Sequence, residues 1–405
     1  MVRTPRARML IEQIRRDWPL PDEAAVESSL QLVERIMAAI AAAGGAIGFD
    51  EYMRMALYEP GLGYYSGGSA RFGKGGDFVT APLLSPLFSR TLARQCADCL
   101  EAMAQPVILE LGAGTGEMAA ELLAELATLE RLPSKYLILE LSGSLRAQQQ
   151  ETLQRRVPEL LPRIEWLDRL PEQPFEGMVL ANEVLDALPV QLFRIRAGEV
   201  LELAVGQEDG RLVWIERPAP EPLQRAVARI QEDLGGPLPD GYTSEYCPRL
   251  EPWLASLAEV LRRGVMLFID YGYPRAEYYH PQRHMGTLIC HYRHRAHSDP
   301  LILPGLQDIT AFVDFTAVAD AGTAAGLELL GFAPQGQFLL GAGLLDLLQE
   351  AMTEPGSRES LLLAQQVKTL TLPGEMGERF KVMAFGRDFA APLRGFSLAD
   401  QRFRL

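Results

Sequence analysis

In the middle of the chain, short runs of apolar residues alternate with stretches in which apolar residues recur at helical spacing. The runs predict buried strands at Val107–Leu111, Tyr136–Leu141 and Gly177–Ala181. The helical spacing predicts helices at Glu117–Leu129 and Ser144–Arg156. Strands that alternate with helices in this way form a parallel sheet that is covered on both faces. The pattern therefore predicts an α/β fold.

The flanking segments add further elements. A helix is expected over Pro21–Ala43, and Gly44-Gly45 is expected to end it. Strand-like segments around an Asp209-Gly210 turn predict an antiparallel excursion from the sheet, at Leu192–Ile195, Val200–Ala204 and Arg211–Ile215. A later helix and two more strands are expected at Arg249–Leu261, Val265–Asp270 and Phe380–Phe385. No sustained pattern is found from Tyr271 to Pro304.

A long segment between Tyr58 and Pro86 is dense in glycine, proline and aromatic residues and has no sustained period. Loops of this length inside a compact protein are usually functional. Its glycines permit hinge conformations, and aromatic residues such as Tyr64 and Tyr65 could close a lid over a ligand. The same aromatic residues could instead anchor the loop by burial.

Composition and charge narrow the possible partners. The 405 residues include 39 Lys and Arg against 53 Asp and Glu, a net charge of −14, which argues against binding to nucleic acid by bulk electrostatics. Four cysteines are too few for a disulfide framework, so we expect a reducing, cytoplasmic compartment. No apolar run is long enough to span a membrane.

A glycine-rich loop, Glu110–Gly116, follows the first predicted strand and precedes a helix. Three glycines at Gly112, Gly114 and Gly116 allow a ligand that contains adenosine to approach the backbone. A dinucleotide fingerprint would place a small residue where this chain has Glu117, whose carboxylate would repel a pyrophosphate. S-adenosylmethionine carries a sulfonium and an ammonium instead, so the loop favours this cofactor. Glu110 is expected near the methionine ammonium.

The second predicted strand ends in Glu140, at the spacing expected for a carboxylate that binds ribose hydroxyls. The alternative interpretation is that the glycine loop is only a tight turn and that Glu140 is an ordinary surface glutamate. The expected cofactor-binding residues are Glu110, Gly112, Gly114, Thr115, Gly116, Glu140, Leu141, Ser142, Asn182, Glu183, Gly76, Thr80 and Tyr65.

Several longer motifs resemble one methyltransferase family, the bacterial and mitochondrial MidA-type proteins. The similarity covers most of the chain. It rests on Tyr58-Glu59-Pro60 with Gly63-Tyr64-Tyr65, Gly76–Pro82 with Ser85, Glu110–Gly116, Asn182–Pro189, Asp270–Tyr273, Gly286–Leu288, and Gly305 with Asp308, Thr310, Val313, Asp314 and Phe315. The resemblance implies a Rossmann-like class I methyltransferase sheet with an N-terminal helical arm and inserted α+β segments.

The same resemblance implies methylation of an arginine in a protein acceptor, such as a subunit of a respiratory complex I. Members of the family carry Pro-Glu-Ile-Ser where this chain has Pro82-Leu83-Leu84-Ser85, and Phe-Gly-Glu where it has Phe88-Ser89-Arg90. Leu83 and Arg90 therefore take the places of two acids. If either acid holds a cationic substrate, arginine specificity does not transfer. A small molecule or another residue type is then the alternative acceptor, and an assembly factor with little catalysis is a further alternative.

Acidic residues at the carboxyl edge of the predicted sheet are candidates for the methyl-transfer chemistry. Carboxylates can orient a guanidinium in bidentate fashion and stabilise it while a proton departs. The expected catalytic residues are Glu183, Asp186, Asp77 and Asp270. Asn182 and Asp186 could alternatively cap the next helix.

The predicted elements divide the chain into three parts. Residues 1–105 form the helical arm and the lid region, residues 106–350 form the cofactor-binding domain with insertions at about 196–248 and 272–307, and residues 351–405 supply a C-terminal helix and a closing strand. The oligomeric state is left open.

We expect no metal site. Cys96 and Cys99 form a CxxC near the C-terminal end of a predicted helix, where buried thiols are the simpler interpretation. All five histidines lie between His280 and His297, where strand or loop structure would splay their side chains and arginines accompany them.

Overall fold

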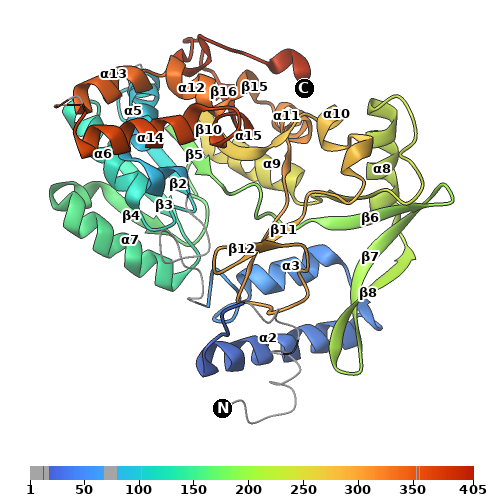
Figure 1. Ribbon diagram of the computed structural model, residues 1–405. Helices are drawn as coiled ribbons and strands as arrows, with labels where there is room; N and C mark the ends of the chain where they lie inside the picture. Colours follow the sequence, from blue (N-terminus) through green and yellow to red (C-terminus); the bar gives the residue numbers. More distant parts are fainter. Residues whose placement is uncertain (1–11, 13–17, 68–79, 102, 353, 355) are drawn as a thin grey trace. The chain divides into compact units, whose positions relative to one another are not determined.

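The computed structural model describes residues 12, 18–67, 80–101, 103–352, 354 and 356–405. The chain divides into two compact units, each built from three stretches of sequence (Figure 1). Unit 1 comprises Met1–Phe78, Ala187–Arg249 and Arg275–Phe312, and unit 2 comprises Val79–Asp186, Leu250–Pro274 and Val313–Leu405.

The described part of unit 2 is built on an eight-stranded sheet in the order β15-β16-β10-β5-β2-β3-β4, with β14 paired to β10. The strands are β2 (Val107–Leu111), β3 (Lys135–Leu139), β4 (Ile164–Leu167), β5 (Phe175–Asn182), β10 (Leu261–Tyr273), β14 (Val313–Asp314), β15 (Glu328–Pro334) and β16 (Phe380–Arg387). Strands β4, β3, β2, β5 and β10 are parallel, whereas β16 is antiparallel to both of its neighbours. The predicted α/β fold with a mainly parallel sheet is confirmed.

Helices cover this sheet on both faces. The helices of unit 2 are α4 (Ala81–Leu84), α5 (Pro86–Leu100), α6 (Glu117–Thr128), α7 (Gly143–Arg156), α9 (Leu250–Val260), α11 (Phe315–Ala324), α12 (Gln335–Gly341), α13 (Leu344–Ala351), α14 (Arg358–Thr371) and α15 (Met376–Arg379), with 3-10 turns at Pro158–Arg163, Arg394–Phe396 and Arg402–Arg404. Side chains of α5, α6, α7, α12 and α14 share one apolar core with Ile108 and Met178 of the sheet. On the other face, Trp253 of α9 packs against Phe268, with ring centroids 6.0 Å apart.

The described part of unit 1 contains two smaller antiparallel sheets. Its helices are α2 (Glu23–Ala42), α3 (Phe49–Tyr58), α8 (Glu221–Asp233) and α10 (Arg275–Tyr278), with a 3-10 turn at Pro281–Arg283. Its strands are β1 (Ala46–Ile47), β6 (Gln191–Arg196), β7 (Glu199–Glu208), β8 (Arg211–Pro218), β9 (Thr243–Tyr246), β11 (Ile289–Tyr292), β12 (Arg295–His297) and β13 (Asp308–Thr310). The expected hairpin is present, because Asp209 and Gly210 both take the positive φ, 47° and 77°, that a tight β7-β8 turn requires.

Two regions differ from the prediction. Strand β4 was not expected, since its residues alternate little and most of them are only half-buried. The segment from Tyr271 to Pro304, predicted to lack regular structure, contains α10, β11 and β12. These elements are only three or four residues long, which is too short for a period to be detected in the sequence.

Candidate active site

The carboxyl ends of β2, β3 and β5 meet at one edge of the sheet, because these strands are parallel and adjacent. The glycine loop follows β2, Glu140 follows β3, and β5 ends at Asn182. The structure therefore brings the three predicted motifs of unit 2 together at the edge where ligands bind in open α/β sheets.

Each glycine of the loop takes a left-handed conformation, with φ of 63° at Gly112, 53° at Gly114 and 82° at Gly116. A Cβ on Gly116 would lie only 3.1 Å from Cα of Gln149, so this glycine allows α7 to approach the loop closely. A Cβ on Gly114 would meet no heavy atom of the described residues within 4 Å. Gly114 thus takes a backbone conformation that favours glycine and has open space beside it.

Glu110 is almost completely buried inside unit 2. Its Oε2 accepts a hydrogen bond of 2.6 Å from the Tyr136 hydroxyl on the neighbouring strand. Burial raises the pKa of Glu110 to about 7, and the nearby charge of Glu140 also raises it, whereas the Tyr136 hydrogen bond lowers it. A carboxyl with this pKa is half ionised near neutral pH, and a cation bound beside it would favour its ionised form.

Glu140 is also buried, and its carboxylate is held in one orientation. Its Oε1 accepts from the backbone N–H of Ser142 at 2.8 Å, and its Oε2 accepts from Nε2 of Gln149 at 2.9 Å. Burial raises the pKa of Glu140, and these two hydrogen bonds oppose the shift. An ordinary surface glutamate would have neither the burial nor the fixed partners, so the geometry favours a binding role.

The other predicted cofactor residues of unit 2 surround these motifs. Ser142 caps α7, with its Oγ accepting from the N–H of Leu145. Leu141, between Glu140 and Ser142, leaves 72% of its surface exposed. Thr115 lies in the glycine loop. Thr80 is the residue before α4, and its carbonyl accepts hydrogen bonds from the N–H groups of Leu83 and Leu84 in that helix.

Asp270, predicted as a catalytic residue, is surrounded by backbone N–H donors. Its Oδ2 accepts from the backbone N–H groups of the loop after β5, at 3.1, 2.9 and 3.2 Å for Val184, Leu185 and Asp186, and its Oδ1 accepts from the N–H of Tyr271. The side chain is fully buried. These contacts hold the backbone of the loop after β5.

Glu183 has a backbone conformation that is rare for its residue type. Its φ is 54°, in the left-handed region, and its N–H donates to the carbonyl of Ile269 at 2.8 Å. Its Oε1 accepts from Nδ2 of Asn182 at 3.2 Å. The Oδ1 of Asn182 is buried and accepts no hydrogen bond from the residues that the structure describes. Strained backbone beside a buried polar atom of this kind is typical of functional sites.

Asp186 lies at the end of the same loop, where its Oδ2 accepts a hydrogen bond from the Tyr271 hydroxyl. Asp186 and Glu183 both raise the pKa of Asp270, after burial as the main cause. The structure thus gathers Glu183, Asp186 and Asp270 at one place. The alternative expectation, in which Asn182 and Asp186 cap a helix, does not fit, because the chain makes a turn after Asp186 and the next regular element is β6.

Three predicted residues fall elsewhere. Gly76 and Asp77 lie outside the described residues. Tyr65 belongs to unit 1, where its hydroxyl donates to Oδ1 of Asp308 at 2.9 Å and its ring stacks on Tyr58. These contacts anchor Tyr65 within its own unit.

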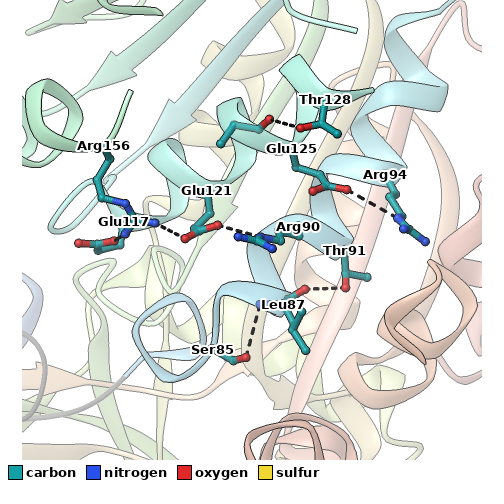
Figure 2. Close-up of polar contacts among 11 residues, drawn as sticks. Ser85, Leu87, Arg90, Thr91, Arg94, Glu117, Glu121, Glu125, Thr128 and Arg156 are labelled. Atoms are coloured by element: carbon teal, nitrogen blue, oxygen red, sulfur yellow. Dashed lines mark hydrogen bonds and ion pairs between the residues drawn. The ribbon is translucent and has the colours of Figure 1, made fainter. Parts of the chain in front are cut away.

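Arg90, at a position where the resemblance implied an acid, forms its ion pair with α6. Its Nε donates to Oε2 of Glu121 at 2.9 Å, and Arg156 of α7 pairs with both Glu121 and Glu117 (Figure 2). The Glu121 side chain is only 7% exposed, whereas that of Arg90 is 41% exposed. Arg90 therefore belongs to an ionic network that joins α5, α6 and α7.

The remaining candidates are the CxxC cysteines and the histidines. Cys96 and Cys99 are buried in α5, and burial raises the pKa of both thiols, to about 12 for Cys99. Among the described residues, which include every histidine, no group of three or more His, Cys, Asp and Glu side chains is arranged to hold a metal ion.

Three residues of the site were missed by sequence analysis. Tyr136 reads only as an apolar strand position, and Trp166 lies in the strand that was not expected. Gln149 is one of three consecutive glutamines, but its helical spacing from Leu145 and Leu153 places it on their buried face, which is the signal that could have found it.

Residues 91–333 match the model of a family described as "Putative S-adenosyl-L-methionine-dependent methyltransferase". The match covers more than half of the chain. The chain belongs to this family. It is a methyltransferase that uses S-adenosylmethionine, as the glycine loop predicted, and the similarity to MidA-type proteins is confirmed.

A solved structure supports both the fold and the cofactor. A crystal structure from Burkholderia thailandensis, bound to S-adenosyl-homocysteine, is 46% identical, covers 96% of this chain and 100% of that chain, and superposes with a TM-score of 0.90. The class I methyltransferase fold is thus confirmed.

The curated relatives are named as enzymes of mitochondria. "Protein arginine methyltransferase NDUFAF7 homolog, mitochondrial" of Drosophila melanogaster is 31% identical, over 84% of this chain and 81% of its own length. The human protein arginine methyltransferase NDUFAF7 is 29% identical, over 84% and 80%. In the described part of the chain, no helix has both the length and the apolar character needed to cross a membrane.

Proposed function

We propose that this methyltransferase methylates an arginine of a protein acceptor, with Glu183 and Asp186 holding the guanidinium. The observation that carries the proposal is the acidic loop after β5, which Asp270 holds through three backbone N–H groups. The names of the curated relatives support both the arginine and the protein acceptor.

The residues at the sheet edge fit S-adenosylmethionine. The open space beside Gly114 accommodates a ligand against the backbone, and the fixed carboxylate of Glu140 suits the ribose hydroxyls. Leu141 offers exposed apolar surface next to Glu140, where an adenine ring would bury it. Glu110 suits the methionine ammonium, and the buried Oδ1 of Asn182 can accept a hydrogen bond from the ligands. When bound, the cofactor supplies an electrophilic methyl group on a sulfonium.

In this proposal the chain orients the nucleophile rather than activating the methyl group. A guanidinium nitrogen forms the new bond to the methyl carbon while the carbon–sulfur bond breaks, and the arginine then loses a proton to Glu183 or to water. Two carboxylates that hold the guanidinium fix the nitrogen in line and stabilise the cation until that proton leaves. The left-handed backbone of Glu183 is a rare conformation of the kind found at functional sites, which supports its role.

The acids absent at positions 83 and 90 do not weaken this proposal. Arg90 is paired with Glu121 in the helical network. The carboxylates that we assign to the guanidinium come from the loop after β5 instead.

All four cysteines keep their thiols, which supports a reducing compartment, and we propose the cytoplasm.

Transfer of a labelled methyl group tests the proposed acceptor. The protein is incubated with S-adenosylmethionine that carries a tritiated methyl group and an extract of cells that lack this protein. Hydrolysis of the labelled proteins should yield methylarginine, and Glu183→Gln should yield little. Glu172→Gln, which alters a carboxylate exposed in an ion pair with Arg169, is the matched control and should retain labelling. Label found in lysine or in small molecules would refute arginine as the acceptor.

A further inference from the structure

We propose that Gln149 is a positioning residue of the cofactor site, which orients Glu140 and thereby sets how strongly the enzyme selects for the two ribose hydroxyls of its cofactor. This inference rests on the proposed placement of the ribose at Glu140. Gln149 lies on α7, outside the glycine loop and outside the strands that carry the predicted motifs.

Gln149 joins the glycine loop, Glu140 and β4 through a single side chain. Its Nε2 donates to the carbonyl of Gly114 at 3.0 Å and to Oε2 of Glu140 at 2.9 Å. Its Oε1 accepts from the indole Nε1 of Trp166 at 3.0 Å. Both N–H groups of the amide are therefore used.

The orientation of this amide is fixed by chemistry as well as by packing. An indole N–H can only donate, so Trp166 requires the Gln149 oxygen on its side, and the amino group must face Gly114 and Glu140. Gln149 is completely buried. Its backbone lies against Gly116, where an added Cβ would be 3.1 Å from Cα of Gln149. The side chain thus has little freedom to turn away.

This arrangement prepares the Glu140 carboxylate for two hydroxyl donors. Ser142 occupies one acceptor position on Oε1, and Gln149 occupies one on Oε2. Each carboxylate oxygen can accept a second hydrogen bond, so one acceptor position remains on each. Two such positions, held in one plane, match two neighbouring hydroxyls of a ribose. Without Gln149 the carboxylate could rotate, and the match would be lost.

The test compares two ligands by calorimetry. One is S-adenosylhomocysteine, and the other is its analogue without the 2′- and 3′-hydroxyls. The wild-type protein should prefer the first about 10- to 100-fold, the range expected for hydrogen bonds to a charged group. Gln149→Met keeps the length of the side chain but removes the donor and the acceptor. It should reduce the preference to about threefold or less, mainly through weaker binding of S-adenosylhomocysteine.

Matched variants separate positioning from a general structural effect. Gln148→Met changes an exposed glutamine on the same helix and should keep the wild-type preference. Trp166→Phe removes the indole donor that fixes the amide, together with one ring of the side chain, and should reduce the preference partially. If Gln149→Met binds both ligands more weakly by the same factor, so that the preference survives, the proposal is wrong. If Gln149→Met does not fold, an unchanged preference in Trp166→Phe leads to the same conclusion.

The placement of the ribose is tested separately by Glu140→Ala. If this variant keeps the wild-type preference for the hydroxyls, Glu140 does not bind the ribose, and the proposed site fails whatever the behaviour of Gln149. If Glu140→Ala loses the preference but Gln149→Met keeps it, the site stands and only the role of Gln149 is refuted.

Discussion

The carboxylate of Asp270 accepts a hydrogen bond of 2.9 Å from the backbone N–H of Leu185, at the centre of the acidic loop after β5. Asp270 comes from β10, a neighbour of β5 in the sheet. One buried side chain thus shapes the loop that presents Glu183 and Asp186. Its loss should affect turnover through the loop rather than through the cofactor.

Asp270→Ala should therefore lower kcat strongly while the affinity for S-adenosylhomocysteine changes little. It should also lower the free energy of unfolding by at least about 2 kcal/mol, because it leaves several N–H groups without an acceptor. Asp270→Asn, which retains one acceptor oxygen, should cost less. Urea denaturation and calorimetry measure the two effects. Equal loss of cofactor affinity and turnover would show that Asp270 acts on the cofactor site instead.

The pKa of Glu110, raised by burial to about 7, predicts a pH-dependent cofactor affinity. The methionine ammonium favours the ionised carboxylate, so binding must displace the proton when the pH is below this pKa. The affinity for S-adenosylhomocysteine should fall about tenfold per pH unit below 7 and level off above it. Calorimetry from pH 5.5 to pH 8.5 measures this, and Glu110→Gln should flatten the profile. A profile that is already flat in the wild-type protein would place the ammonium elsewhere.

Gly114→Val should abolish cofactor binding and still fold. No described heavy atom lies within 4 Å of the position of a Cβ there, so a side chain would enter the ligand space rather than the core. The positive φ of 53° should cost about 1 to 3 kcal/mol of stability. Circular dichroism checks the fold and calorimetry checks the binding. Wild-type affinity in a folded variant would refute the location of the cofactor.

Arg90→Glu restores the acid found in the similar family, and the structure predicts that it is harmful here. The new carboxylate would face the nearly buried Glu121 in place of its partner. We expect a loss of stability of about 1 kcal/mol or more, and no gain in methyl transfer. Arg90→Gln should cost less, because Arg156 still pairs with Glu121. Higher activity in Arg90→Glu would instead indicate that position 90 belongs to the substrate site.

The sequence predicts the cofactor site better than the acceptor site. Gly112, Gly114, Gly116 and Glu140 are recognisable because a strand, a glycine loop and a second strand place them at fixed spacings. The predicted strand that contains Asp270 is present, although β10 continues to Tyr273, and the contacts of Asp270 with backbone N–H groups depend on the register of β10 beside β5, which no local pattern reveals.

Other features were invisible for related reasons. The role of Gln149 depends on how closely α7 approaches the glycine loop, which is a matter of packing between elements. The short strands β11 and β12 pair through contacts distant in sequence. The domain boundaries given above, at residues 105 and 350, stay a prediction, as do the roles of Gly76 and Asp77.

The most direct test of arginine methylation by this site is a comparison of methyl marks in cells. Mass spectrometry of proteins from cells without this protein, and from the same cells complemented with wild-type protein, Glu183→Gln or Glu172→Gln, would identify the acceptor. We predict a methylarginine that is absent without the protein, restored by the wild type and by Glu172→Gln, and not restored by Glu183→Gln. A mark on another residue type, or an arginine mark that Glu183→Gln restores fully, would contradict the assignment of the acidic loop to an arginine acceptor.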